Sequence, residues 1–222
     1  MGNTRASSAD TRKRIARRAK KARLELPASV VDLLADYLDL LTLWNRKVNL
    51  TALQDADEAV DRLIVEPALA ARLVPAGLST LMDIGSGGGS PAIPLKLCAP
   101  QLRLWMVESK TRKAAFLREA VRQLALSNAE VETRRFEELL TRPDLIEGMD
   151  LLTVRAVRLT GRTLLELQSF VRPGGQLWLF SGRSRHNGSG VPPPLQVESV
   201  EPLLESLGSH LWRLRKAVVS TV

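Results

Sequence analysis

The sequence predicts an α/β fold in which a doubly wound parallel sheet follows an N-terminal cap of helices. From Leu81 onward, short apolar runs of strand length alternate with longer amphipathic runs, which is typical of parallel strands joined by right-handed crossover helices. The first of these apolar runs ends at Asp83 and opens into four glycines within five residues. A glycine-rich turn between a buried strand and a helix lets the backbone pass close to a bound ligand.

Residues 1–25 carry most of the charge of this 222-residue chain, whose formal net charge is +8. They hold nine basic residues against two acidic ones, so this segment alone accounts for +7. We therefore expect residues 1–26 to be a basic, flexible tail that binds nucleic-acid phosphates, and Arg12, Arg14, Arg17 and Arg18 are its candidate contacts. The alternatives are a solvated end without a partner, a segment that becomes helical on a polyanion, and an organellar transit peptide.

Residues 27–77 are expected to form the helical cap. Apolar residues from Val30 to Trp44 recur with a 3.6-residue period, which predicts one amphipathic helix after Pro27. A polar turn follows, and a second helix is expected to begin near Asp55, where acidic residues favour the helix N-terminus. Pro67 is expected to interrupt or restart this helix, because proline has no backbone N–H.

Residues 78–222 are expected to form the sheet domain. The predicted strands are Thr80–Ile84, Leu102–Val107, Glu130–Thr133, Asp150–Val154, Gln176–Phe180, Leu195–Val200 and His210–Val219. The predicted helices are Pro91–Cys98, Thr111–Leu126 and Leu159–Val171, the last of which closes at Pro173-Gly174-Gly175, and Phe136–Leu140 is expected to form a turn or short helix. We expect Ser181–Pro194 to be a loop and the last two strands to form an antiparallel hairpin.

Several classes of protein are disfavoured by composition. The single cysteine, Cys98, allows no internal disulfide, lies in an apolar run typical of a core and fits a reducing compartment. The two histidines, His186 and His210, are far apart and belong to no Cys/His cluster, so we expect no metal site. The chain contains no run of 18 apolar residues and no apolar core of a secretory signal, so we expect no membrane span and a cytoplasmic protein.

Two acids flank the glycine turn and indicate its ligand. Glu108 ends the second strand, 19 residues after Gly89, where an acid in a doubly wound fold accepts hydrogen bonds from ribose hydroxyls. Asp83, directly before the turn, would repel a pyrophosphate but suits an ammonium or a sulfonium group. These acids favour S-adenosylmethionine over NAD as the cofactor. Ser90 is expected to cap the next helix, and Pro91 to occupy its first position.

Together these motifs resemble the bacterial small-subunit ribosomal RNA guanine-N(7) methyltransferases, the glucose-inhibited division protein B type. The resemblance extends from about Leu38 to Gly182, most of the chain. Five stretches carry it: Trp44–Thr51, Asp83–Leu95, Glu108–Leu117, Arg135–Glu138 and Val154–Val157. Within the glycine motif, the run Ile93-Pro94-Leu95 is more specific than the glycines.

The resemblance implies a Rossmann-like class I methyltransferase that uses S-adenosylmethionine to methylate ring nitrogen 7 of a guanine in the 530 loop of 16S ribosomal RNA. The implied cofactor contacts are Asp83, Gly85, Gly87, Gly89, Ser90, Glu108, Ser109, Phe136, Glu137 and Arg155. Arg155 would also position the target base. Besides the tail, the implied RNA contacts are Arg46, Lys47, Arg112 and Lys113, of which the last two could equally be a solvated helix start. The implied partner is the small ribosomal subunit, and the implied oligomeric state is a monomer.

The chain also departs from the family's pattern. Leu63, Glu66 and Pro67 stand where a His and then Asp-Ser are common, and Ser181-Gly182 stands where Lys-Gly is usual. Ser90 and Ala92 also differ from the usual residues. These departures leave two alternatives open. One is an enzyme of the same fold with another RNA, a protein or a small molecule as substrate. The other is an RNA-binding module with a vestigial cofactor pocket.

Overall fold

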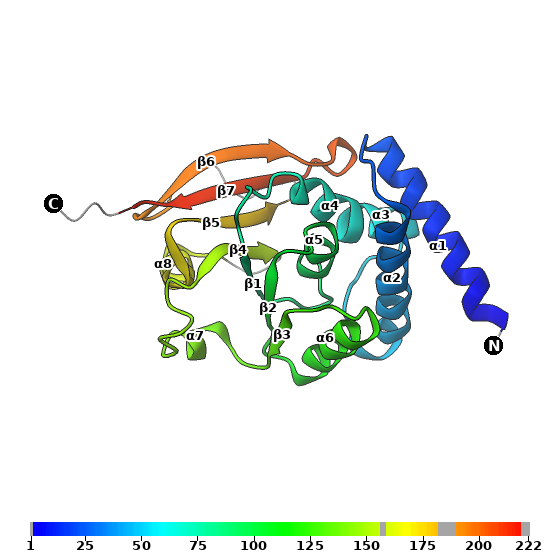
Figure 1. Cartoon of the computed structure of the whole chain (residues 1–222), viewed down its shortest axis with the longest axis horizontal. Helices are drawn as coiled ribbons and strands as arrows, with labels where there is room; N and C mark the ends of the chain where they lie inside the picture. Colours follow the sequence, from blue (N-terminus) through cyan, green and yellow to red (C-terminus); the bar gives the residue numbers. More distant parts are fainter. Residues whose placement is uncertain (1, 156–158, 182–189, 219–222) are drawn as a thin grey trace.

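The computed structural model describes residues 2–155, 159–181 and 190–218, with side chains from Ser8 onward (Figure 1). A single seven-stranded sheet with the strand order β3-β2-β1-β4-β5-β7-β6 forms its centre. The strands are β1 Thr80–Ile84, β2 Arg103–Val107, β3 Ala129–Glu132, β4 Met149–Arg155, β5 Val171–Ser181, β6 Leu195–Pro202 and β7 His210–Lys216. The first five run parallel, and β7 lies antiparallel between β5 and β6, which confirms the predicted parallel sheet with a closing hairpin.

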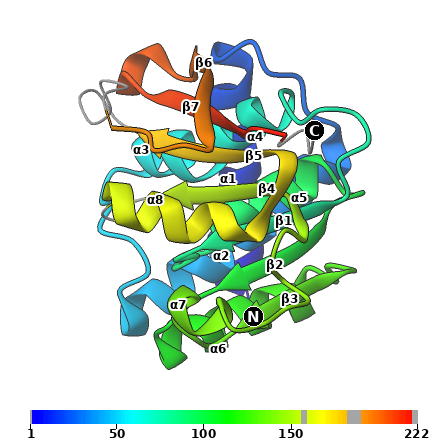
Figure 2. The ribbon, with the colours of Figure 1, turned by 90° about the vertical axis from the view of Figure 1, so that its left-hand side faces the viewer.

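Helices cover both faces of this sheet. One face packs against α7 (Phe136–Leu139) and α8 (Gly161–Leu167), which lie in front of the sheet in Figure 2. The other packs against α5 (Ala92–Cys98), α6 (Thr111–Gln123) and the cap. Because strand side chains alternate between faces, Leu81 joins the cluster on the cap side and Met82 the cluster on the α8 side.

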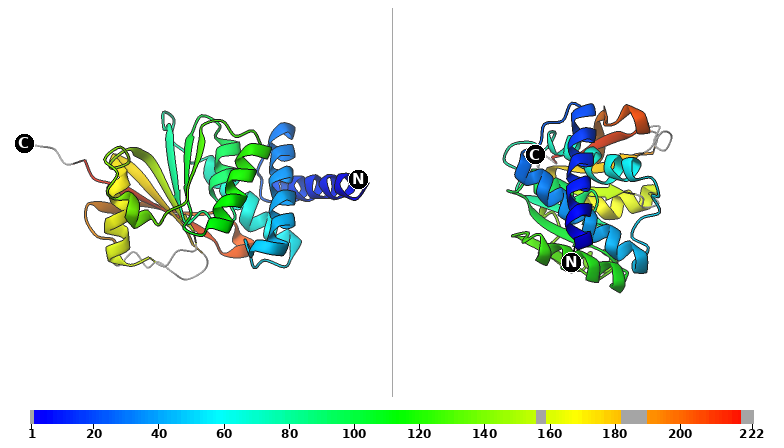
Figure 3. Two further views of the ribbon diagram at one scale, coloured as in Figure 1. Left: turned by 90° about the horizontal axis from the view of Figure 1, so that it is seen from below. Right: turned by 90° about the vertical axis from the view of Figure 1, so that its right-hand side faces the viewer.

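The N-terminal segment is a helix where a flexible tail was expected. Helix α1 (Gly2–Lys21) lies across the outside of the cap in Figure 3 and packs on α2 (Ala28–Val48). Its Ile15 is fully buried and Ala19 is 3% exposed. Burial of this apolar stripe orders the segment, whereas its composition predicted a helix only on a polyanion.

The second cap helix is continuous but changes its winding twice. It comprises α3 (Ala56–Val60), a π turn (Asp61–Val65) and α4 (Glu66–Ala71). Asp55 caps its start by accepting the N–H of Glu58 at 2.7 Å. Pro67 lies in the first turn of α4, directly after the π turn, so the α-helical winding restarts there as expected.

The predicted boundary between the helix Leu159–Val171 and the strand Gln176–Phe180 was wrong. Helix α8 and the short 3₁₀ helix Gln168–Phe170 end before Val171, which already pairs with Met149 at the start of β5. The turn residues 173–175 therefore lie inside the strand, and the register shifts between Met149 and Leu151 at that point. Pro and Gly in a strand commonly mark such an irregularity rather than a loop.

Candidate active site

The site lies where the order of the parallel strands reverses. The chain builds β1, β2 and β3 toward one edge and then returns to add β4 and β5 on the other side of β1. Ligands of doubly wound sheets bind at the carboxyl ends of the strands beside this switch point. Asp83 of β1 is in register with Thr153 of β4, and Arg155 follows two residues later on the same face.

Asp83 is a buried carboxylate with one oxygen unpaired. Its side chain is 1% exposed, and Oδ1 accepts the hydroxyl of Thr153 at 2.6 Å. Oδ2 is buried and has no hydrogen-bond partner. Burial raises the pKa of Asp83 to about 6, although the Thr153 hydrogen bond and the charge of Arg155 both lower it. A buried carboxylate oxygen without a donor is costly unless a ligand supplies one.

The glycine turn passes next to this carboxylate and is held by Glu108. Gly85, Gly87 and Gly89 have φ of 72°, 51° and 85°, which side chains rarely tolerate. A Cβ on Gly89 would also lie 2.6 Å from Cδ1 of Ile93. Glu108 accepts the N–H of Gly87 at 2.9 Å, and its other oxygen accepts an amide of the following turn. The predicted acid and glycines are therefore one connected structure.

The cap supports the opposite side of the same turn. The hydroxyl of Tyr37, a fully buried residue of α2, donates to the carbonyl of Gly88 at 2.6 Å. A Cβ on Gly88 would lie 3.3 Å from both the Leu41 side chain and the Leu50 carbonyl. Asn45 fixes the segment after α2 by accepting the N–H of Leu50 at 2.6 Å. Sequence reasoning missed Tyr37, because its position in an apolar helical stripe signalled only core packing.

Ser90 does not cap the helix that follows it. Pro91 is the N-cap residue of α5, with no side-chain cap, and the helix begins at Ala92. The Ser90 hydroxyl donates instead to the carbonyl of Leu63 in the cap, at 3.0 Å. The expected capping role was wrong, because a long-range acceptor lies within reach of the hydroxyl. Ser90 joins the glycine turn to the cap.

Arg155 is half-buried at the carboxyl end of β4. Its Nη1 lies 3.0 Å from Oε2 of Glu66, which is itself 4% exposed, and donates to the carbonyl of Arg62 at 2.5 Å. The guanidinium carbon is 4.6 Å from the centre of the Phe180 ring. Nε and Nη2 are buried without hydrogen-bond partners. Burial lowers the pKa of Arg155, and Glu66 and Asp83 oppose that shift.

Other predicted cofactor contacts lie around the same strand ends. Ser109 is exposed directly after Glu108. Phe136 and Glu137 begin α7, shortly after β3, and are half-buried and exposed, respectively. The N–H of Glu108 donates to the carbonyl of Glu132 at 3.0 Å, so β2 and β3 end side by side. These three side chains make no contact with Asp83 or Arg155 in the described hydrogen bonds and ion pairs, and their cofactor roles stay predictions.

Four of the predicted RNA contacts lie on helix ends beside the glycine turn. Arg46 and Lys47 are exposed in the last turn of α2, and Arg112 is exposed and Lys113 half-buried in the first turn of α6. The two helices pack together through Trp44 and Phe116, whose ring centres are 5.8 Å apart. Trp44 is half-buried and packs against the core.

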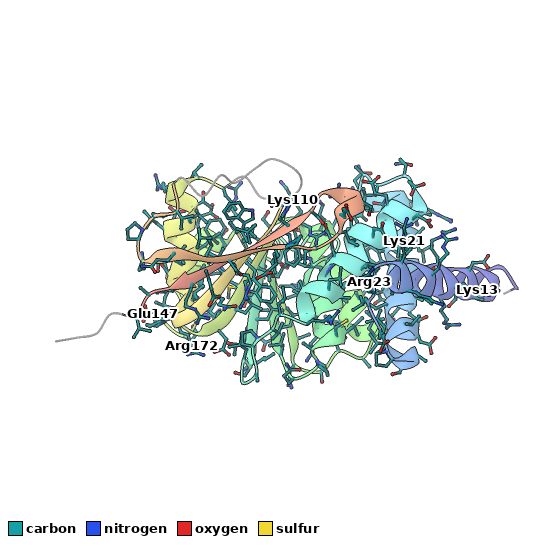
Figure 4. All side chains as sticks on the ribbon, turned by 90° about the horizontal axis from the view of Figure 1, so that it is seen from above. Lys13, Lys21, Arg23, Lys110, Glu147 and Arg172 are labelled. Atoms are coloured by element: carbon teal, nitrogen blue, oxygen red, sulfur yellow. The ribbon has the colours of Figure 1, made fainter. Side chains whose placement is uncertain are left out.

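The arginines of α1 contact the cap. Arg12 lies 2.7 Å from Asp32, and Arg14 and Arg17 lie 3.3 and 2.7 Å from Asp57. Arg18 forms an ion pair with the buried Asp61, whose carboxylate is 4% exposed. Each guanidinium is therefore paired with a cap carboxylate, which favours a role in fixing α1 over the RNA contact expected from the sequence. Lys13 and Lys21, labelled in Figure 4, are exposed on α1.

Sequence reasoning also missed Glu66 and Thr153, the partners of Arg155 and Asp83. Glu66 drew attention only as a departure from the family pattern, and Thr153 gave no local signal. Ala156, Val157 and Gly182, part of the motifs quoted above, lie outside the described residues. Within the described ranges, no three His, Cys, Asp or Glu side chains gather as metal ligands would. No helix there has the length and apolar character needed to span a membrane.

The residues present fit S-adenosylmethionine. Its methionine end carries an ammonium and a carboxylate, and the site offers an acid and a guanidinium, each with buried atoms that have no hydrogen-bond partner. Glu108 stands at the end of β2, where ribose hydroxyls are bound in such folds. The positive φ values of the glycine turn let main-chain atoms approach the ligand without an intervening Cβ.

Known proteins share both the sequence pattern and the fold. A family model described as "GidB: rRNA small subunit methyltransferase G" matches residues 31–190. Proteins named ribosomal RNA small subunit methyltransferase G are similar. One from Xylella fastidiosa (strain 9a5c) is 41% identical over 178 residues, 78% of this chain and 79% of that protein. Another from Stenotrophomonas maltophilia (strain K279a) is 38% identical over 183 residues, 82% of this chain and 84% of that protein.

Solved methyltransferases share the fold at low identity. A SAM-dependent methyltransferase from Aquifex aeolicus matches with a TM-score of 0.56 and 16% identity, covering 77% of this chain and 97% of that one. The mitomycin 7-O-methyltransferase matches with a TM-score of 0.57 and 18% identity, covering 88% and 74%. The fold is thus that of the Rossmann-like S-adenosylmethionine-dependent methyltransferases. From its match to the family model and to these relatives, the chain belongs to the rRNA small subunit methyltransferase G family.

Proposed function

We propose that this enzyme transfers the methyl group of S-adenosylmethionine to ring nitrogen 7 of a guanine in the 530 loop of 16S ribosomal RNA. The observation that carries the proposal is the pair of incompletely bonded charges, the buried Asp83 and the half-buried Arg155, beside the glycine turn at the switch point. Membership of the family supports a small-subunit RNA substrate. We further propose that the protein is a cytoplasmic monomer whose partner is the small ribosomal subunit.

The chemistry places few demands on acid–base groups. Nitrogen 7 of guanine has a lone pair in the ring plane, so no proton has to leave before attack. S-adenosylmethionine supplies a methyl group activated by its sulfonium. The protein must then align the reactants and exclude water, which the closed packing of the cap on the glycine turn favours. The absence of a histidine or cysteine among the described residues of the switch point therefore fits this reaction.

Arg155 is a positioning group in this mechanism and not a base. Burial lowers its pKa, but an arginine keeps its proton in proteins and has no acceptor atom. Guanine gains a positive charge when nitrogen 7 is methylated, and the positive charge of Arg155 would not stabilise it. Asp83 and Glu66 are the buried carboxylates near Arg155, and we propose that their negative charges offset the positive charge of the site.

The RNA is proposed to bind across the exposed ends of α2 and α6. Arg46, Lys47, Arg112 and Lys113 lie there, and no acidic partner of these side chains appears among the described ion pairs. Cations that contact phosphate weaken binding uniformly when removed and reduce its salt dependence by about one unit of slope each. Replacing Arg112 and Lys113 together by alanine should do both, whereas replacing the exposed Arg122, paired with Glu119 at 2.6 Å, should not.

The deciding experiment presents 30S subunits, naked 16S RNA and protein without RNA to the enzyme with methyl-labelled cofactor. The labelled nucleotide is then mapped. Label in a 530-loop guanine is the expected result. Label in another RNA or in protein would instead support the alternative that this is an enzyme of the same fold with a different substrate. Binding of RNA without binding of S-adenosylmethionine, measured by calorimetry, would support the RNA-binding module.

A further inference from the structure

The second cap helix has its π turn (Asp61–Val65) beside the switch point. Within this turn, the N–H of Glu66 donates to the carbonyl of Asp61, five residues earlier, and Pro67 has no N–H. In a regular α-helix the amides of residues 66 and 67 would bond the carbonyls of Arg62 and Leu63. The π turn and the proline therefore leave two neighbouring carbonyls without these usual donors.

Both carbonyls receive a side chain from the sheet domain. The carbonyl of Arg62 accepts Nη1 of Arg155 at 2.5 Å, and the carbonyl of Leu63 accepts the hydroxyl of Ser90 at 3.0 Å. Arg155 ends β4 and Ser90 ends the glycine turn, so one helical irregularity contacts both parts of the site. π turns of this kind occur frequently at functional sites.

Glu66 completes the hold on Arg155. Its buried carboxylate lies 3.0 Å from Nη1, the same nitrogen that donates to the carbonyl of Arg62. The guanidinium carbon lies over the Phe180 ring, 4.6 Å from its centre. The protein thus contacts Nη1 and the side of the guanidinium toward this ring, and the edge formed by Nε and Nη2 is left without a partner.

We propose that Glu66 is a positioning residue, which holds Arg155 so that Nε and Nη2 receive the carboxylate at the methionine end of S-adenosylmethionine. Two parallel N–H groups on a guanidinium match the two oxygens of a carboxylate. Asp83, whose charge interacts with that of Arg155, has a free oxygen for the neighbouring ammonium. The inference rests on the cofactor of the family and does not depend on the RNA target.

The alternative acceptor for this edge is the guanine itself. Arginine commonly binds guanine through its oxygen 6 and nitrogen 7 together. Nitrogen 7 must keep its lone pair free to accept the methyl group, so this bidentate contact would block the proposed reaction. The cofactor carboxylate has no such conflict, which is why we assign the free edge of Arg155 to it.

The test measures binding of three ligands by calorimetry without any RNA. The ligands are S-adenosylhomocysteine, its decarboxylated form and methylthioadenosine, which lacks the whole amino-acid end. Glu66→Gln should weaken S-adenosylhomocysteine about tenfold and leave the other two ligands within about twofold of wild type. Glu66→Asp keeps the charge and should recover part of the loss. Glu58→Gln is the matched control, because Glu58 bridges Arg62 at 3.0 Å on the same helix and should change none of the three.

Two results would overturn the inference. Equal losses for all three ligands would mean that Glu66 only supports the fold, and unchanged binding of S-adenosylhomocysteine would mean that Arg155 needs no help from it. If Glu66→Gln does not fold, Arg155→Lys gives the same comparison, because lysine keeps the charge but lacks the paired donors. A 530-loop guanine that stays unlabelled would refute the proposed RNA target and leave this result standing.

Discussion

Replacing Asp83 by asparagine should make the unliganded protein more stable relative to wild type as the pH rises, while weakening its cofactor site. The wild-type carboxylate is buried, and its folded-state pKa is about 6 against an ordinary value of 3.8. This difference corresponds to about 3 kcal/mol by which the folded state disfavours the ionised form. Asparagine carries no charge, so the variant escapes this cost and keeps an acceptor for the Thr153 hydroxyl.

The pH dependence follows from the direction of the shift. A carboxyl whose folded pKa is raised loses stability as the pH rises from its unfolded pKa through its folded pKa. The cost of Asp83 should therefore be about 0.5 kcal/mol at pH 4 and reach about 3 kcal/mol at pH 8. The unpaired amide N–H₂ of the asparagine has its own cost of about 1–3 kcal/mol, but that cost is the same at both pH values.

Urea unfolding of wild type and Asp83→Asn at pH 4 and pH 8 measures this change. The stability of the variant relative to wild type should increase by about 2.5 kcal/mol between the two pH values. Asp150→Asn is the control. Burial opposes its ionisation, but hydrogen bonds from the amides of Ser79 and Thr80 and from Arg172 hold its pKa at about 2. It is ionised at both pH values, so its replacement should cost about 2 kcal/mol at each.

The same shift predicts how cofactor binding responds to pH. Only the ionised Asp83 attracts an ammonium, so wild-type affinity for S-adenosylhomocysteine should fall up to tenfold per pH unit below about 6. Asp83→Asn should bind weakly at every pH, without this dependence. An equal stability difference at pH 4 and pH 8 would refute the argument, because it would show that no ionised carboxylate is held at a cost in the folded protein.

Three further predictions concern the cap and the glycine turn. Arg18→Ala should destabilise the protein by about 3–5 kcal/mol in urea unfolding, because it leaves a buried carboxylate unpaired, whereas Arg17→Ala, 64% exposed, should cost less than about 1 kcal/mol. Gly89→Ala should weaken calorimetric binding of S-adenosylhomocysteine, because its φ is strained and its Cβ would lie 2.6 Å from the Ile93 side chain, so that the turn or this side chain must shift, whereas Gly77→Ala, with a similar φ but open space, should only cost about 1–2 kcal/mol of stability. Tyr37→Phe should cost about 1–3 kcal/mol and weaken that binding, because it leaves the carbonyl that supports the turn without its donor, and binding equal to wild type would contradict the assigned role of the cap.

The fold and the sheet side of the site could be predicted because their signals are local. The alternation of strands and helices and the run from Asp83 through the glycines each lie within a short stretch of chain. The acid at Glu108 was found by its fixed distance from that turn. By contrast, the contacts of Glu66 and Tyr37 depend on where the cap docks. A buried glutamate beside a proline gives no local sign that its partner is an arginine on β4.

The errors have the same origin. Ser90 has the residue type and position of a helix cap, and only the docked cap supplies the carbonyl that draws its hydroxyl away. The basic N-terminal segment has the composition of a free tail, and it docks because its apolar stripe is buried and its arginines meet acids on two helices distant in sequence. Local sequence does not show which distant groups a segment will meet. The hydrogen bond of Ser90 and the docking of α1 both depend on groups far away in sequence.

The ion pairs of α1 affect how a salt titration of RNA binding should be interpreted. A slope in log salt is commonly converted into a number of phosphate contacts. Exposed pairs such as those of Arg14 and Arg17 are screened by the same ions, so salt also weakens the attachment of α1. A cap carboxylate freed in this way repels a nearby phosphate. The measured slope would then combine ions released from the RNA with ions taken up by the protein. Comparing the slopes of wild type and Arg17→Ala separates these two contributions, because the variant lacks one of the ion pairs of α1.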